Sequence, residues 1–448
     1  MGIASLARWL EALPARAVEL RAGERTALLL GFAYFFCLLC SYYLLRPLRD
    51  AMGLAGGPDQ LQWLFSATFV VMLLLTPVFG ALVRTLPPAR FVAVIYRFFG
   101  ANILLFALLI AAGVREVAVA RVFFVWVSVY NLFVVSIFWS VTADCFSNTQ
   151  GRRLFGFIAA GGTAGTFAGP ALAAGLAGTL GPVALTLAAA ALLEVSLRCC
   201  HRLLAERTAL SLAEGPVAEG RIADRRASAE ARLGGSIFAG ATLIARSPLL
   251  LGIVGYLLLH TSAATFLYFE QARIVADSLV GTAERTRFFA QMDLLVSTLT
   301  LLLQVFVTGR LMRSFGVTIA LLLLPVAALC AFAGIALWPG LVTLAIAQGV
   351  RRAADFAFAR PGREVLFTLL SREEKYKAKN FIETVVYRGG DAASGWLSTA
   401  FTALGAGFGG LTLLMLPLSL LWMRLAISLG RVEAKLRNGK DANGDCHG

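Results

Sequence analysis

Two groups of charged residues lie in stretches that are otherwise apolar, and most of their charges are arginines. The first group ends an apolar run that begins near Thr26, and it consists of Arg46, Arg49 and Asp50. The second lies within residues 349–364 and consists of Arg351, Arg352, Asp355, Arg360, Arg363 and Glu364. Guanidinium groups bind phosphate and carboxylate bidentately. Charge is costly inside a bilayer, so charged side chains there usually face a pathway or a partner. The residues therefore predict that the chain binds an organic anion.

The first group follows two tyrosines at the end of a run long enough to cross a membrane, which takes about 20 apolar residues. Arg46 and Arg49 are candidates to bind the anion, and Tyr42 and Tyr43 could stack on a planar part of it. A simpler alternative is that both arginines reach outward to the membrane interface, as basic residues near helix ends do. Aromatic residues in membrane helices also commonly pack against lipid or core.

In the second group, Arg352, Arg360 and Arg363 are the candidates to bind the anion. At about 100° per residue these three arginines share one face of a helix. The alternative is a helix that ends near Ala359, with the charges after it in the cytoplasm. That alternative would leave the apolar residues 365–370 without a place in the membrane, which is an unfavourable exposure.

Local pairing is also expected in this second group. Arg351 and Asp355 are at i,i+4, as are Arg360 and Glu364, and such pairs partly neutralise each other. Residues 361–362, Pro-Gly, are expected to interrupt the helix and to free backbone groups. Freed backbone groups are tolerated in a membrane only beside a cavity or another helix.

Acidic residues are candidates for coupling or gating, and the set consists of Asp50, Asp144, Glu270, Asp355 and Glu364. Glu270 could carry a coupling proton or pair with an arginine, or it could be an interfacial carboxylate that pairs with Arg273. His260, deeper in the same apolar run, is better explained as a core histidine than as a proton relay. Asp293 and Asp391 are further candidates.

The composition places the chain in a lipid bilayer. Of its 448 residues, 58% are hydrophobic and 15% are charged, whereas soluble domains carry about 25% charged residues. The net charge of +14 would suggest nucleic acid in a soluble protein. Here the basic residues fall between apolar runs, which is typical of cytoplasmic loops, so no nucleic-acid partner is expected. We find no nucleophile–base pair, phosphate-binding loop or metal-ligand pattern, so we expect neither an enzyme nor a bound cofactor or metal.

Apolar runs of about 20 residues predict an all-α membrane protein with about twelve transmembrane helices. They lie near residues 26–50, 60–83, 91–113, 117–143, 154–177, 181–203, 248–270, 287–309, 316–338, 340–370, 380–404 and 408–429. Basic residues concentrate in alternate loops, which predicts that both termini are cytoplasmic.

A charged segment without an apolar run divides six spans from six. Two such halves are the architecture of the major facilitator fold. The predicted parts are a cytoplasmic amphipathic N-terminus (1–25), an N-terminal half (26–204), a cytoplasmic linker (205–235), a C-terminal half (236–430) and a disordered cytoplasmic tail (431–448).

The fifth span is rich in glycine. Gly156, Gly165, Gly169 and Pro170 resemble the fifth-helix signature of major facilitator antiporters. Gly161, Gly165 and Gly169 are spaced by fours and form a smooth stripe against which another helix can pack closely. A purely structural packing role is an equally good interpretation of this stripe.

Residues 43–50 and 360–364, with Arg388-Gly-Gly-Asp391 beyond, resemble the ATP/ADP translocase family of obligate intracellular bacteria and plastids. The resemblance implies nucleotide exchange on a twelve-helix fold of major facilitator type. It also implies that Arg49 and Arg363 stand at functional basic positions, where that family has lysine, and that Glu270 matches an acidic position of the seventh helix. The acidic residue that the family carries early in its fourth helix has no counterpart in residues 127–131.

Together these features predict a monomeric secondary transporter in a bacterial inner membrane that exchanges a small anionic solute, a nucleotide by resemblance. The competing functions are a proton-coupled exporter of small organic compounds, which the fifth-helix signature favours, and a non-transporting membrane sensor or assembly factor. The density of charge in two spans is evidence against the last of these, because such charge is costly without a pathway.

Overall fold

The computed structural model describes residues 24–85, 87–146, 148–214, 237–370, 378–379 and 381–444. The regular secondary structure of these residues is entirely helical, and no strand occurs among them. The helices form two compact units.

Nine helical stretches within the described residues are long and apolar enough to cross a membrane. One of them, Thr282–Leu337, has 56 residues. At ~1.5 Å per residue it is about 84 Å long, so it contains two crossings of a hydrocarbon core of about 30 Å. The turn is at Gly316, whose φ of 72° is a left-handed conformation that glycine adopts without strain. The predicted boundary between the eighth and ninth spans falls at this glycine.

Two further predicted spans, 340–370 and 380–404, are helical although they carry several charges. Their elements are α13 (Leu341–Ala354), the π-helical η3 (Asp355–Ala359), α14 (Arg360–Phe367), the π-helical η4 (Ile382–Val386) and α16 (Tyr387–Ala403). The nine stretches provide ten crossings, because one of them crosses twice. The two charged spans provide the other two of the twelve predicted crossings.

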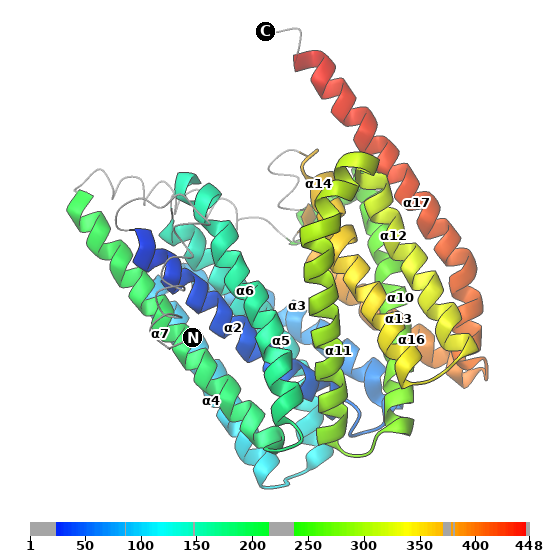
Figure 1. Ribbon diagram of the computed structural model, residues 1–448, viewed down its shortest axis with the longest axis horizontal. Coiled ribbons are helices and arrows are strands. Elements are labelled where there is room, and N and C mark those ends of the chain that lie inside the picture. The colour runs from blue at the N-terminus through cyan, green and yellow to red at the C-terminus, as the bar shows by residue number, and fades with distance from the viewer. Residues whose placement is uncertain are drawn as a thin grey trace, which may run out of the picture. The chain divides into compact units, whose positions relative to one another are not determined.

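The first unit is organised around its N-terminal helix, α2. Its helices are α2 (Glu24–Met52), α3 (Leu61–Thr85) from Pro77 onward, α4 (Pro88–Ala111), α5 (Glu116–Cys145), α6 (Asn148–Leu176), α7 (Gly181–Glu214) and α11 (Thr282–Leu303) as far as Gln291. Helix α2 packs against α5, α6 and α7, and α4 packs against α7 (Figure 1).

Buried hydroxyl groups connect the helices of this unit. The Ser41 hydroxyl donates to the carbonyl oxygen of Ala189 at 2.8 Å. Since its one proton is used there, it accepts from the Tyr130 hydroxyl at 3.0 Å. Similarly, the hydroxyl oxygens of Tyr34 and Tyr96 lie 2.7 Å apart. Each bond satisfies polar atoms that would be costly to bury alone.

We expect Ser41→Ala to lower the free energy of unfolding by about 2 kcal/mol, because it leaves both the Tyr130 hydroxyl and the Ala189 carbonyl without this partner. The matched control is Ser136→Ala, since the Ser136 hydroxyl is exposed and, among the described residues, bonds to the carbonyl of Leu132 in its own helix. Thermal unfolding of the purified variants measures the difference. Equal losses of stability in the two variants would contradict the bridging role of Ser41.

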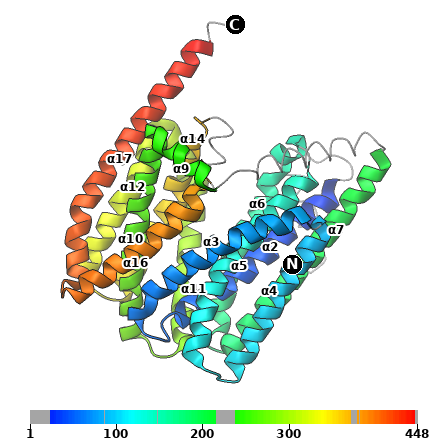
Figure 2. The ribbon, with the colours of Figure 1, turned by 180° about the vertical axis from the view of Figure 1, so that it is seen from behind.

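The second unit contains the remaining helices. It includes the elements from α13 to α16 and the remaining parts of α3 and α11. Its other helices are η1 (Pro58–Gln60), α9 (Ile237–Arg246), α10 (Pro248–Ser278), the π-helical η2 (Gln304–Thr308), α12 (Gly309–Leu337) and α17 (Gly407–Gly444). Helix α10 packs against α16 and α17, and α12 packs against α13 and α17 (Figure 2). The Tyr256 hydroxyl of α10 donates to the carbonyl of Leu321 in α12 at 2.8 Å.

The segments predicted outside the membrane are only partly described. Residues 1–23 of the predicted amphipathic N-terminus and residues 215–235 of the predicted linker lie outside the described residues. The linker's first residues, 205–214, continue α7. The tail, predicted to be disordered from residue 431, continues α17 as far as Gly444.

Candidate functional site

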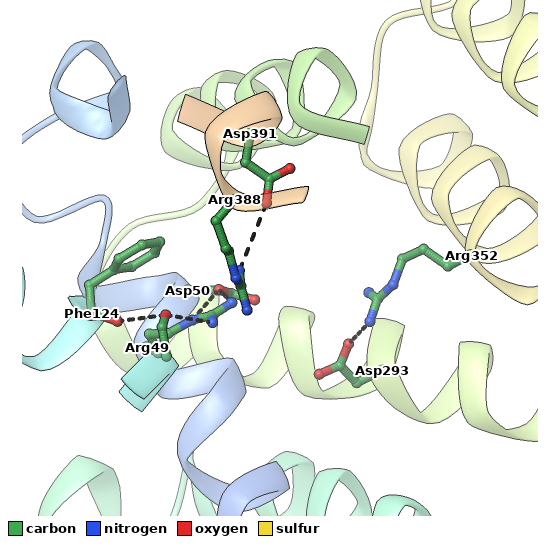
Figure 3. A network of polar contacts seen from close by, with 8 residues as sticks. Arg49, Asp50, Phe124, Asp293, Arg352, Arg388 and Asp391 are labelled. Carbon is green, nitrogen blue, oxygen red and sulfur yellow. Dashed lines mark hydrogen bonds and ion pairs between the residues drawn. The ribbon is translucent and has the colours of Figure 1, made fainter. Parts of the chain in front are cut away.

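In the first unit, Arg49 is held by its chain neighbour and by α5. Its Nε and Nη2 donate to Asp50 Oδ1 at 3.0 and 2.6 Å, and its Nη1 donates to Ser128 Oγ at 3.3 Å. The guanidinium carbon lies 5.0 Å from the centre of the Phe124 ring. Figure 3 shows Arg49 and Asp50 beside the Phe124 backbone oxygen, which accepts from the Ser128 hydroxyl at 3.1 Å. Two elements, α2 and α5, therefore position this guanidinium.

The burial of this pair does not fit arginines that simply reach outward. The Arg49 and Asp50 side chains are 15% and 7% exposed. Arg46 is half-buried, and its guanidinium carbon is 5.5 Å from the centre of the Tyr43 ring. Tyr42 is buried, and its ring meets that of Tyr43 edge-on at 5.1 Å. Tyr43 and Arg46 therefore form one stacked pair on α2.

The predicted glycine stripe of α6 lies against α2. A Cβ atom built at Gly161 would lie 2.5 Å from the backbone oxygen of Phe32, and one built at Gly169 would lie 2.6 Å from Tyr43 Cβ. Gly165 is equally close to α2. Gly156 does not share this contact, because a Cβ there would have no other heavy atom of the described residues within 4 Å. Pro170 lies inside α6.

In the second unit, the charged pairs differ from those predicted by i,i+4 spacing. Arg360 Nε donates to Asp355 Oδ2 at 3.1 Å, which is an i,i+5 contact. The cause is η3, since a π-helical turn brings residues five apart into line. Arg351 bonds to Gln348 instead, at 2.9 Å from Nη2. The charge of Arg351 still acts on Asp355, as the spacing predicted, but without a hydrogen bond between them. The predicted pair Arg360–Glu364 is wrong.

Glu364 is exposed and bonds to Lys379 Nζ at 2.6 Å. It lies on α14, which continues to Phe367, so the alternative of a helix ending near Ala359 does not hold. Asp144 is exposed in the last turn of α5.

The expected helix break at residues 361–362 is also absent, because backbone dihedral angles stay helical from η3 into α14. Pro361 has no N–H and cannot donate to the carbonyl of Ala357 four residues earlier. The Thr308 hydroxyl donates to that carbonyl at 3.0 Å, and Gln304 Nε2 donates to the carbonyl of Phe356 at 3.1 Å. Side chains of η2 thus satisfy carbonyls that the irregular helix leaves without backbone donors.

Two aspartates named as further candidates each pair with an arginine. Asp293 Oδ1 accepts from Arg352 Nη2 at 2.6 Å, which links α11 to α13. Asp391 Oδ2 is 3.8 Å from Arg388 Nη1, and its Oδ1 accepts from Thr265 at 3.2 Å. Figure 3 shows both pairs. Arg352 is thus paired with Asp293, whereas Arg360 is paired with Asp355.

Glu270 is the partner of Arg273, with 3.7 Å between Oε2 and Nη1. Arg273 also donates to the Thr402 hydroxyl at 2.6 Å. This arrangement matches the interfacial alternative for Glu270. Within the described residues, no three His, Cys, Asp or Glu side chains are grouped closely enough to hold a metal ion.

Sequence patterns did not predict the aromatic surroundings of His260. This histidine is 2% exposed, and its Nε2 lies 3.8 Å from Asp355 Oδ1. Its ring lies 6.0 Å from that of Tyr387 and 6.2 Å from that of Trp422. These rings come from α16 and α17, and nothing in the sequence distinguishes them from other aromatic residues of the spans.

The comparisons with solved structures identify the fold. No protein-family model and no curated protein matches the sequence. A crystal structure of peptide transporter POT in complex with sulfate is similar with a TM-score of 0.60 and 16% identity, covering 93% of this chain and 98% of that one. A POT family transporter in complex with 5-aminolevulinic acid gives 0.59 and 10%, covering 91% and 96%.

The nucleoside transporter NupG is similar over 94% of this chain and 99% of its own, with a TM-score of 0.57 and 15% identity. All three similarities extend over nearly the whole chain, as the twelve helices lead one to expect. The chain is a multi-pass membrane protein with the fold of the major facilitator transporters.

Proposed function

We propose that the protein is a secondary transporter that exchanges an anionic, phosphorylated organic solute by alternating access, and that the solute is a nucleotide such as ATP or ADP. The residues proposed to recognise the anionic group are Arg49 and Arg363, assisted by Arg46 and Arg360. The sequence resemblance to ATP/ADP translocases supports the nucleotide. The similar structures support transport of a small organic solute, since they are a peptide transporter, a POT family transporter and a nucleoside transporter.

The observation that carries this proposal is the state of Arg363. Its Nε is buried and has no hydrogen-bond partner among the described residues. Buried charged donors are normally paired, because an unpaired one forfeits its hydration without compensation. An oxygen of a phosphate or carboxylate would supply the acceptor that this donor lacks.

The same proposal covers location and organisation. Basic loops place both termini in the cytoplasm of a bacterium, with the helices in its inner membrane. Residues 26–204 and 236–430 form the two six-helix halves, and residues 205–235 link them.

Thermal unfolding of the detergent-purified protein tests the substrate. The panel consists of ATP, ADP, other organic phosphates, dicarboxylates and organic cations. A ligand that binds only the folded state at 100 times its Kd adds about 2.7 kcal/mol of stability. We expect ATP or ADP to raise the unfolding temperature and sodium chloride at equal ionic strength to leave it unchanged.

The competing functions give different results. Stabilisation by organic cations alone, with proton-dependent transport, would favour the exporter that the glycine signature of α6 suggests. Nucleotide stabilisation without any exchange in proteoliposomes would favour a non-transporting sensor.

A further inference from the structure

A buried polar cluster surrounds Asp355 in the second unit. His260 of α10 is 2% exposed, Asp355 of η3 is 5% exposed and Trp422 of α17 is fully buried. Four buried polar atoms of the cluster have no hydrogen-bond partner among the described residues: His260 Nδ1, Asp355 Oδ1, Arg363 Nε and Trp422 Nε1. The 3.8 Å between His260 Nε2 and Asp355 Oδ1 is too long for a hydrogen bond. The cluster is therefore only partly satisfied by the protein itself.

Positive charge exceeds negative charge in this cluster. The charges of Arg351, Arg360 and Arg363 all act on the carboxylate of Asp355. Glu383 is a second carboxylate on which Arg360 and Arg363 act, so three positive charges face two negative ones. Arg351 is fixed on Gln348, whereas Arg360 is bound to Asp355 itself. Buried positive charge without enough counter-charge is unfavourable. The cluster is thus suited to accept one more anionic group.

Arg360 and Arg363, the two arginines proposed to bind the anion, differ in exposure and in what they bind. The Arg360 side chain is 48% exposed and lies over the Phe356 ring at 4.2 Å, so a solute can reach it. Arg363 has a buried Nε with no partner to give up. A bound anion would therefore displace Asp355 from Arg360 and add a bond to Arg363.

We infer that Asp355 is an internal counterion that competes with the anionic group of the substrate for Arg360 and Arg363. Substrate binding releases Asp355 from Arg360, and the return of Asp355 favours substrate release. This role rests on the proposed function. In it, Asp355 is the residue that keeps substrate binding reversible.

The experiment compares Asp355→Asn with the wild type by titrating the purified protein with ADP and, separately, with inorganic phosphate. Asp355→Asn removes the charge that competes with ADP for Arg360, so it is expected to lower the Kd for ADP about tenfold. Exchange in proteoliposomes should become slower, because release loses its competitor. Asp355→Glu keeps the charge and is therefore not expected to lower the Kd for ADP.

A second comparison serves if Asp355→Asn does not fold. Arg360→Gln removes an arginine whose bond to substrate is offset by its lost bond to Asp355, whereas Arg363→Gln removes a donor that gives up nothing. We therefore expect Arg363→Gln to raise the Kd for ADP about tenfold more than Arg360→Gln does.

The outcomes separate the two proposals. If the wild type binds ADP but folded Asp355→Asn binds it equally or more weakly, Asp355 is a structural partner and the counterion role is overturned. Equal losses in Arg360→Gln and Arg363→Gln overturn it as well. If the wild type binds none of the anions, the proposed function and this inference both fail.

Discussion

Arg49→Ala is expected to abolish stabilisation by nucleotides and to slow nucleotide exchange in proteoliposomes at least ~100-fold. The Arg49 guanidinium is nearly buried beside Asp50 and Phe124, where a phosphate would form charge-assisted hydrogen bonds with it. Two such bonds contribute roughly 3 kcal/mol, which corresponds to about a 100-fold change at ~1.4 kcal/mol per tenfold. Uptake of labelled ADP into ADP-loaded vesicles measures the effect.

Two controls accompany this variant. Arg49→Lys keeps the charge but loses the planar fork, so its exchange rate should lie between those of the wild type and Arg49→Ala. Arg198→Ala removes an arginine that is 71% exposed on α7 and pairs with Glu194, and it should exchange as the wild type does. If Arg49→Ala exchanged normally while Glu270→Gln were inactive, the carboxylate-dependent exporter would replace our proposal.

The helices were predictable because apolar length is a strong and local signal. The run that begins near Thr26 became α2, and the charged run at 340–370 is helical from Leu341 as far as Phe367. The length of these apolar runs had predicted both helices. Of the arginines in that charged run, Arg351 is buried and Arg352 nearly so, whereas the Arg360 side chain is half-exposed. These predictions needed no knowledge of neighbouring helices.

The pairing of charges could not be predicted in the same way. Spacing at i,i+4 assumes a regular α-helix, but η3 aligns Arg360 with Asp355 at i,i+5. No residue preference predicts a π-helical segment. Two of its carbonyl groups accept hydrogen bonds from Thr308 and Gln304, which belong to another part of the chain. The partner of Arg352, Asp293, also belongs to a different helix. Such contacts depend on tertiary packing, which a single sequence does not show.

Gly165→Leu is expected to destabilise the protein by at least about 3 kcal/mol and to prevent recovery of folded protein. A Cβ at this position would lie 2.5 Å from the backbone oxygen of Phe36 and 3.0 Å from the backbone nitrogen of Cys40. Overpacked cores typically lose 1–3 kcal/mol through movement of side chains. Here the obstacle is the α2 backbone, which cannot move aside by changing a rotamer. Size-exclusion chromatography and thermal unfolding of the detergent-solubilised variant measure the loss.

Gly156→Leu is the matched control, because it makes the same change on the same helix. Gly156 is exposed, and a Cβ built there meets no other heavy atom of the described residues within 4 Å. Leucine also favours helix more than glycine does, by roughly 0.8 kcal/mol. Gly156→Leu should therefore fold at least as well as the wild type. If both variants failed to fold, the cause would be a need for glycine throughout α6. Failure of Gly165→Leu alone would assign the cause to close contact between α6 and α2, the helix that carries Arg49.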